Sequence, residues 1–170
     1  MDAAMRVGAA CMMTAASAWG GRMLAGTQTR RMQALEEALH GVRRLQVEML
    51  DRRLPVKEAL AACPGALFAA VSRAMEGGSP PGTAFGAAEG SLSARGGPLD
   101  SLTGGDLAAL RRLFSGLGEN GVEPQRLRLH ESAEELERLL GEARRKREEH
   151  GRLYTSLGAL VGLAAALLLL

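Results

Sequence analysis

The sequence contains few of the residues that build stacking surfaces, disulfide frameworks and metal sites. Its 170 residues include one Trp, one Tyr, three Phe, two Cys and three His. So few aromatic side chains offer no stacking platform for bases, and we expect no nucleic-acid partner. Cys11 and Cys63 lie in different regions and predict no disulfide framework, which suits a reducing compartment. No stretch alternates apolar and polar residues for long enough to predict a strand.

No catalytic constellation is recognisable either. The histidines at 40, 130 and 150 are far apart and show no metal-ligand spacing on one helix face. The glycine pairs Gly77–Gly78 and Gly104–Gly105 neither follow a strand nor carry the lysine of a phosphate loop. We therefore expect a protein that is not an enzyme, with no cofactor and no metal site.

What the sequence does have is a long uncharged run at its C-terminal end. Residues 153–170 read LYTSLGALVGLAAALLLL, and a helix of this length spans roughly 27 Å, close to the hydrocarbon core of a bilayer. Basic residues precede the run: Arg144, Arg145, Lys146 and Arg147. We expect a C-terminal transmembrane helix over residues 153–170, and we expect these four side chains to contact anionic lipid headgroups.

A weaker apolar segment at the other end predicts an N-terminal transmembrane helix over residues 3–24. It consists mostly of Ala, Met and Gly, with Arg6 and Arg22 as its basic residues. Trp19 suits an interfacial anchor. The same segment also resembles a signal peptide cleaved near residues 15–18, and the chain would then be an exported helical module with a C-terminal membrane anchor. Both readings stay open from the sequence.

The placement of basic residues predicts which side of the membrane the middle of the chain occupies. Arg22 lies at the end of the first segment, Arg30 and Arg31 follow it, and residues 144–152 precede the second. By the positive-inside rule, the domain of residues 25–152 lies in the cytoplasm and both termini lie on the far side of the cell membrane. Residues 22–152 hold 20 Lys and Arg against 18 Asp and Glu, so net charge itself says little.

This cytoplasmic domain is expected to be all-α, a compact bundle of about five to six helices. Helix-forming residues dominate, and apolar positions recur every three or four residues. We expect helices over about residues 28–50, from Pro55, over 64–76, from Thr103 and from Pro124. We expect the least regular structure in 79–97, where TAFGAAEGSL at residues 83–92 is a candidate small helix. Thr103 and Asp106 resemble a capping box.

The last of these helices is expected to be about 45 residues long and to run into the membrane. Its apolar positions in the domain are Leu127, Leu129, Leu136, Leu139 and Leu140. The face that would meet a partner is open; one candidate consists of Arg43–Arg44 with Arg111–Arg112. Within the transmembrane run, Ser156, Gly158 and Gly162 form a small-residue face of the GxxxG type. Whether this face pairs within the hairpin or between chains, as in a homo-oligomer, is also open.

Several motifs resemble those of one family over essentially the whole chain. They are LPVKEAL at residues 54–60, LFSGLGENG at 113–121 and YTSLGALVG at 154–162. With them the chain resembles stage III sporulation protein AB of endospore-forming bacteria. Gln125 matches the family's glutamine, whereas Glu119–Asn120 stand where the family usually has Ser-Asp, and Phe85 stands where it often has Trp.

The resemblance implies a component of the channel complex that connects mother cell and forespore. In that picture the protein lies in the outer forespore membrane, on the mother-cell side, and is similar to the inner-membrane platform proteins of type II secretion systems and type IV pili. Those proteins have compact helical cytoplasmic domains that contact a hexameric secretion ATPase. The partners implied are a secretion-type ATPase and other membrane subunits of the same complex, with membrane lipids around them.

Overall fold

The structure is a computed structural model that describes residues 26–118 and 121–169, with side chains as far as Glu148 apart from that of Val122. Its described backbone is helical without a strand, as the sequence predicts. The chain divides into two units, Arg30–Glu142 and Met1–Thr29 with Ala143–Leu170. We call Arg30–Glu142 the compact unit. The predicted transmembrane helix over residues 3–24 lies outside the described residues.

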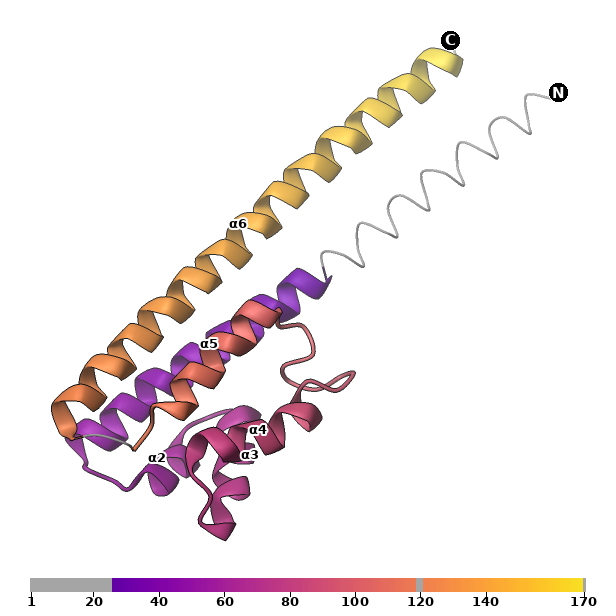
Figure 1. Cartoon of the computed structure of the whole chain (residues 1–170). Coiled ribbons are helices and arrows are strands. Elements are labelled where there is room, and N and C mark those ends of the chain that lie inside the picture. The colour runs from indigo at the N-terminus through magenta and orange to yellow at the C-terminus, as the bar shows by residue number, and fades with distance from the viewer. Residues whose placement is uncertain (1–25, 119–120, 170) are drawn as a thin grey trace. The chain divides into compact units, whose positions relative to one another are not determined.

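The helices follow one another with short connections, apart from the longer stretch 93–103 between α4 and α5 (Figure 1). After a helix over residues 26–46 come η1 (Val47–Asp51), α2 (Val56–Ala62), α3 (Ala66–Ala74), η2 (Met75–Gly77), α4 (Pro81–Leu92), α5 (Gly104–Ser115) and α6 (Val122–Leu169). These bounds confirm the helices predicted around residues 28–50, from Pro55, over 64–76 and from Thr103.

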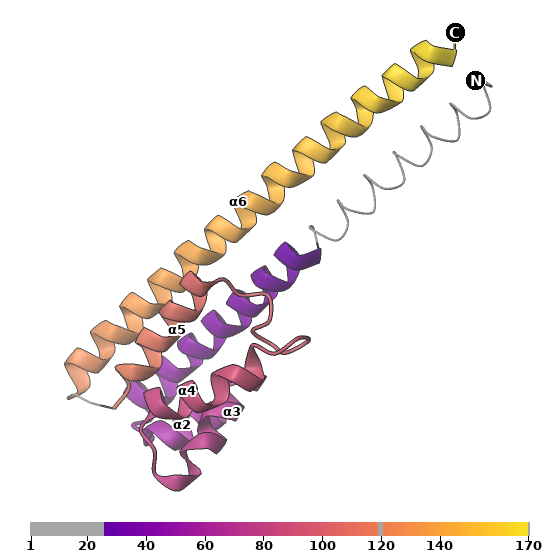
Figure 2. The ribbon, with the colours of Figure 1, turned by 45° about the vertical axis from the view of Figure 1, so that its right-hand side comes forward.

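The compact unit has two groups of helices. Figures 1 and 2 both show the helix over residues 26–46, α5 and the first turns of α6 side by side, with the shorter α2, α3 and α4 against one flank. Among the short helices α2 packs on α3, and α4 packs on both α3 and α5. The apolar positions predicted for the first helix are buried in this arrangement: Leu35, Ala38, Leu39, Val42 and Leu45.

Three phenylalanines join the two groups. Phe114 of α5 stacks on Phe85 of α4 with ring centroids 4.8 Å apart, and lies 5.9 Å from Phe68 of α3 in a tilted arrangement. All three side chains are buried. Because aromatic pairs at these separations are attractive beyond their buried area, this cluster stabilises the contact of α5 with α3 and α4.

The stretch predicted to be the least regular contains a twelve-residue helix. Residues 81–92 form α4, which begins at Pro81 and buries Ala84, Phe85, Ala88 and Leu92. Proline is favoured in the first helical turn, where its missing N–H leaves no bond unmade. Helix α4 includes residues 83–92, the candidate small helix within that stretch, and begins two residues earlier. Residues 79–80 before it and 93–103 after it have irregular backbone.

Helix α6 confirms the predicted length of the last helix. It runs without interruption for 48 residues, Val122–Leu169. No helix among the residues that the structure describes is found to be long and apolar enough to cross a membrane. Side chains beyond Glu148 are not described, so the transmembrane helix over residues 153–170 and the packing face of Ser156, Gly158 and Gly162 stay predictions.

Cys63 provides a natural probe of unfolding. Its side chain is buried, and its Sγ lies 3.4 Å from the carbonyl oxygen of Gly41 and 3.2 Å from that of Ala59. Burial, and to a lesser degree the charge of Glu48, raises the pKa of this thiol to about 11. Since the thiolate is the reactive form, Cys63 should react with a maleimide only after the compact unit unfolds. In a chain carrying Cys11→Ala, labelling at increasing urea concentration therefore measures stability.

Gly41→Ala is expected to destabilise the compact unit by about 1–3 kcal/mol through overpacking. In most helices Ala is favoured over Gly by roughly 0.5–1 kcal/mol, but here the added methyl has no room. A Cβ at Gly41 would lie 1.9 Å from Cε2 of Phe68, whose ring is fully buried. The urea midpoint of Cys63 labelling in mild detergent should fall. Gly90→Ala in α4, where a Cβ meets nothing within 4 Å, is the control; equal midpoints for the two variants would contradict the prediction.

Candidate functional site

A buried ion pair joins the first helix to the beginning of α5. Nε and Nη2 of Arg31 donate to the two carboxylate oxygens of Asp106 at 2.7 and 2.8 Å. Both side chains are buried, and 75 positions separate them in the sequence. Asp106 also completes the predicted capping box: its Oδ2 accepts hydrogen bonds from the N–H and the hydroxyl of Thr103, both at 2.8 Å.

The environment keeps both members of this pair charged. Burial by itself would raise the pKa of Asp106, but the hydrogen bonds from Arg31 and Thr103 outweigh it and hold the pKa below its ordinary value. The hydrogen bond to Asp106 raises the pKa of Arg31. Arg31, which the sequence placed with the membrane-flanking basic residues, is therefore part of the core. This pair is structural, because both side chains are buried and the two nitrogens of Arg31 that donate are taken up by Asp106.

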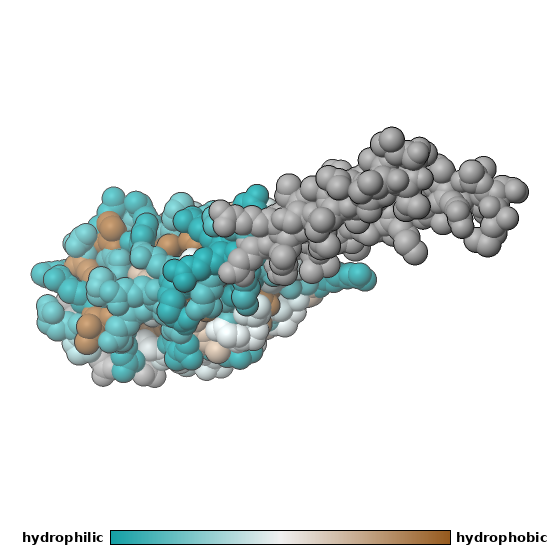
Figure 3. Space-filling model, turned by 90° about the horizontal axis from the view of Figure 1, so that it is seen from above, coloured by the Kyte–Doolittle hydropathy of each residue, from teal (hydrophilic) through white to brown (hydrophobic). Residues whose placement is uncertain are grey.

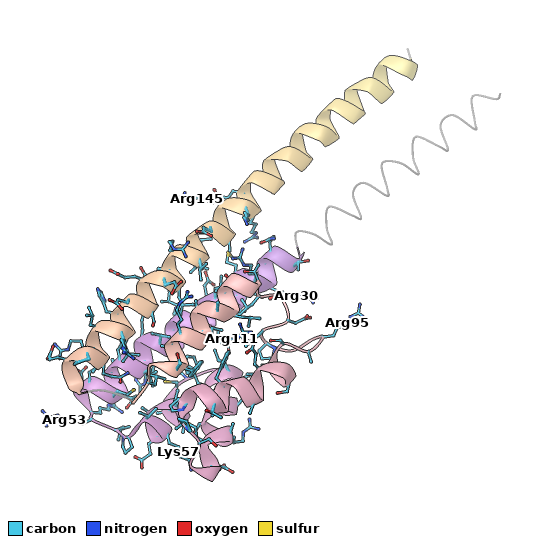
Figure 4. The ribbon with its side chains drawn as sticks, viewed as in Figure 1. Arg30, Arg53, Lys57, Arg95, Arg111 and Arg145 are labelled. Carbon is cyan, nitrogen blue, oxygen red and sulfur yellow. The ribbon has the colours of Figure 1, made fainter. Side chains whose placement is uncertain are left out.

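The arginine surface suggested by the sequence is occupied by ion pairs within the fold. Arg43 pairs with Glu137 at 2.5 Å and Arg44 with Glu48 at 2.6 Å. Arg111 of α5, labelled in Figure 4, pairs with Glu89 of α4, and Arg112 pairs with Glu135 of α6. Arg43, Arg111 and Arg112 thus connect different helices of the compact unit, and Arg44 pairs one turn along its own segment. They do not form a cationic face that is free for a partner.

One groove lies between α5 and α6 and has a volume of about 420 Å³. Gln125 lines it and is buried; its Oε1 accepts a hydrogen bond from the N–H of Gly118 at 3.0 Å. That bond fixes the turn between α5 and α6, where Gly118 has a positive φ of 84°. The glutamine that carries part of the family resemblance thus supports the backbone of this connection.

A second groove, of about 620 Å³, lies between η1 and the first turns of α6. We call it the η1–α6 groove. Residues 46, 47, 50 and 51 line one wall, and residues 123, 126, 127 and 130 line the other. Val47 and Leu127 are exposed in it, by 39 % and 58 %. Leu127 therefore differs from the other apolar positions of the last helix: Leu129, Leu136, Leu139 and Leu140 are buried, but Leu127 faces the groove.

The wall formed by η1 has an unusual backbone. The N–H of Arg52 donates to the carbonyl of Val47, five residues earlier, at 3.1 Å, which is the π-helical pattern. Glu48 within it is completely buried and pairs with Arg44 and Arg52. The following Arg53 has a φ of +55°, a left-handed conformation that non-glycine residues rarely adopt.

The remaining predicted site residues lie in the other unit. The side chains of Arg144, Arg145, Lys146 and Arg147 are exposed on α6, and Figure 4 shows Arg145 pointing away from the helix. Within the part of the chain described, no three His, Cys, Asp or Glu side chains gather as metal ligands would. Sequence reasoning missed the η1–α6 groove. The sequence gives no signal for it, because the apolar spacing of the first helix continues from Leu45 to Met49, whereas the residue that the structure buries there is Glu48.

Comparison with known proteins gives one match. A family model described as stage III sporulation protein AB matches residues 6–170. No curated protein and no solved structure matches the chain. The matched range includes every residue that the structure describes, together with the segments at 54–60 and 154–162 that carry the resemblance in the sequence.

Proposed function

Since the chain belongs to the stage III sporulation protein AB family, we propose that it is a non-enzymatic membrane subunit of the complex between mother cell and forespore. In this proposal the compact unit is a platform that docks a cytoplasmic secretion-type ATPase and contacts other membrane subunits. The observation that carries it is the family match over residues 6–170. The all-helical compact unit agrees with it, because the platform proteins that the sequence resembles have helical cytoplasmic domains.

The proposal includes attachment to the outer forespore membrane from the mother-cell side. Residues 3–24 and 153–170 would cross the bilayer, with the compact unit in the cytoplasm and both termini on the far side. The uncharged run at 153–170 and the four basic residues before it support this placement. Arg144, Arg145, Lys146 and Arg147 would contact lipid headgroups. Ser156, Gly158 and Gly162 would pack against another membrane helix.

The test is recovery of the ATPase with the protein from sporulating cells. We expect the full chain, extracted in mild detergent and captured by an affinity tag, to carry the secretion-type ATPase of the complex at a constant ratio. The control is the same capture from cells in which the tag is on an unrelated membrane protein. No enrichment of the ATPase over this control under any mild extraction would contradict the proposal.

Sidedness distinguishes this proposal from the exported alternative. Ala94 lies in the exposed connection between α4 and α5, so a cysteine placed there by Ala94→Cys, with Cys11→Ala, gives a reactive thiol beside the buried Cys63. An impermeant maleimide should label it in lysed cells and not in intact ones. Labelling in intact cells, together with loss of about 18 N-terminal residues by mass spectrometry, would favour an exported module with a cleaved signal peptide.

A further inference from the structure

The large apolar side chains that reach the surface of the compact unit gather in one place. Among the described side chains, those found exposed are Val47 and Leu127, and both line the η1–α6 groove together with the half-buried Leu50. Figure 3 shows small brown, apolar patches within a mostly hydrophilic surface at the left-hand end of that view. Single exposed apolar residues are ordinary. Several exposed apolar side chains that lie together in a groove with charged residues at its edge are typical of a binding surface.

At η1 an apolar residue is exposed in the groove and a charged residue is buried in the core. The buried stripe of the first helix reaches Leu45 and continues, three residues later, at Glu48, which is completely buried. Val47, the apolar neighbour, is exposed instead. Burying a carboxylate is unfavourable, and Arg44 and Arg52 are needed to compensate its charge. The reverse order of these two residues would favour stability, so the exposure of Val47 is a feature that stability alone does not explain.

The backbone beside the groove departs from ordinary geometry in two consecutive places. Val47–Asp51 form the π-helix η1, and π-turns within helices are frequent at functional sites. Arg53, labelled in Figure 4, has the left-handed φ of +55° two residues later. Backbone conformations of this kind cluster at ligand clamps and binding sites. The unusual backbone and the exposed apolar residues thus occupy the same end of the compact unit.

We infer that the η1–α6 groove is the docking site for an amphipathic helix of the cytoplasmic partner. The inference rests on the proposed function, because it takes that partner to be the ATPase. An apolar side chain of the incoming helix would lie against Val47, Leu50 and Leu127. A groove of about 620 Å³ has the size of pockets that take up such anchors, and helix-in-groove binding uses apolar residues spaced by three and four positions.

The charged residues at the edge of the η1–α6 groove indicate which charged residues the partner helix carries beside its apolar anchor. Glu123, Arg126, Leu127 and His130 line the groove from α6 at the spacing of one helix face, with the acidic residue one turn before the basic one. Within the described part of the chain, no ion pair involves Glu123, Arg126 or Asp51 of the opposite wall. A complementary helix therefore has a basic residue on one side of its apolar anchor, which would pair with Glu123 and Asp51. On the other side it has an acidic residue, which would pair with Arg126.

The groove lies at one end of the compact unit. The helix over residues 26–46 and α6 run antiparallel in the compact unit, as Figure 1 and the Arg43–Glu137 pair show. The groove lies between the end of the first and the start of the second. It is thus at the opposite end of the compact unit from Arg30 and Glu142, where the chain passes into the other unit.

A second copy of the chain is a poorer occupant. Stable homodimers bury roughly 800 Å² or more per partner and are strongly apolar. The exposed apolar surface here comes from Val47 and Leu127, with part of Leu50. Three side chains in a concave site suit an inserted anchor and fall short of a self-association surface.

The test uses the full-length protein with Leu127→Glu, captured with the ATPase from sporulating cells in mild detergent. We expect recovery of the ATPase to fall at least tenfold, because the exposed Leu127 would be replaced by a charge in the apolar centre of the groove. Val47→Glu should act in the same way. Ala87→Glu adds the same charge at an exposed position of α4 and should leave recovery unchanged. Protection of Cys63 from maleimide reports whether each variant is folded.

A charge exchange gives an independent measurement. Glu123→Arg and Arg126→Glu should each weaken recovery of the ATPase several-fold, with a loss that depends on salt concentration. Glu76→Arg in η2, at an exposed position outside the groove, is the matched reversal and should have little effect. Reversals that act no more strongly in the groove than at Glu76 would overturn the assigned partner chemistry.

The outcomes separate this inference from the proposed function. If the unaltered chain recovers no ATPase, the proposed function fails and the inference fails with it. If the unaltered chain and folded Leu127→Glu recover equal amounts, the proposed function stands and the groove assignment alone is overturned. If Leu127→Glu changes the oligomeric size of the detergent-extracted protein but not its recovery of the ATPase, the occupant is a second copy and the partner assignment is wrong.

Discussion

Asp106→Ala should lower the free energy of unfolding of the compact unit by about 3–5 kcal/mol, the usual cost of breaking a buried ion pair. The substitution leaves the guanidinium of Arg31, 5 % exposed, without its carboxylate. It also removes the acceptor for the N–H and the hydroxyl of Thr103. With a urea dependence of about 1–3 kcal/mol per molar, the midpoint of Cys63 labelling should fall by about 1 M or more.

The second partner of the pair provides the matched comparison. Arg31→Met alone leaves Asp106 buried but still bonded to Thr103, so we expect a smaller loss than in Asp106→Ala. In the double variant neither charge is left alone, and the combined loss should be well below the sum of the two single losses. Strictly additive losses would show that the two side chains do not interact in solution.

The pH dependence of the same pair has a definite sign. The pKa of Asp106 is lower in the folded unit than its ordinary value near 3.9. Its contribution to stability is therefore complete above the unfolded pKa and is lost as the pH falls through the folded one. Between pH 6 and a pH below 4, the urea midpoint of the unaltered chain should therefore fall further than that of Asp106→Ala. Unfolding at both pH values is followed by far-ultraviolet circular dichroism. Identical losses in both chains would contradict the assignment.

Phe114→Ala should destabilise the compact unit by about 3–5 kcal/mol, as large-to-small changes of buried aromatic residues do. Phe114 is fully buried and is the residue that contacts both other rings. Its loss leaves a cavity where α3, α4 and α5 meet. The urea midpoint of Cys63 labelling measures the change.

Phe114→Leu is the control for this position. It retains most of the volume and all of the apolar character, so its cost should stay below about 1.5 kcal/mol. Because the ring stacking with Phe85 is lost in both variants, the difference between them isolates the cavity. If Phe114→Leu were as unstable as Phe114→Ala, the aromatic contacts and not the filled volume would be the main contribution of this residue.

The local features of the fold follow from short-range patterns in the sequence. The spacing of Leu35, Val42 and Leu45 predicts both the first helix and its buried face, and these residues are buried. Thr103 with Asp106 predicts the start of α5, where the capping box is found. Both predictions succeed because a helix face and a helix cap depend on residues within one or two turns.

Features that depend on distant residues were not predictable in this way. Nothing near Arg31 in the sequence indicates that its partner is Asp106, 75 positions later, so its charge was read as a membrane flank. Leu127 fits the apolar period of α6, and its exposure depends on where the wall of η1 lies. The groove could not be predicted because two segments distant in the sequence form its walls, whereas the spacing of apolar residues describes only one helix at a time.

The distance between Arg31 and Asp106 also sets an order of events during synthesis. At about 5–20 residues per second, a ribosome needs roughly 4–15 s to add the 75 positions that separate them. Throughout that interval Arg31 has no carboxylate to receive it, and the first helix cannot take its final place in the core. Helices α2, α3 and α4 are made before the pair can close. The compact unit therefore completes its folding late, and in a nascent chain halted before residue 106 the helix over residues 31–46 should be more open to proteases than in the complete unit.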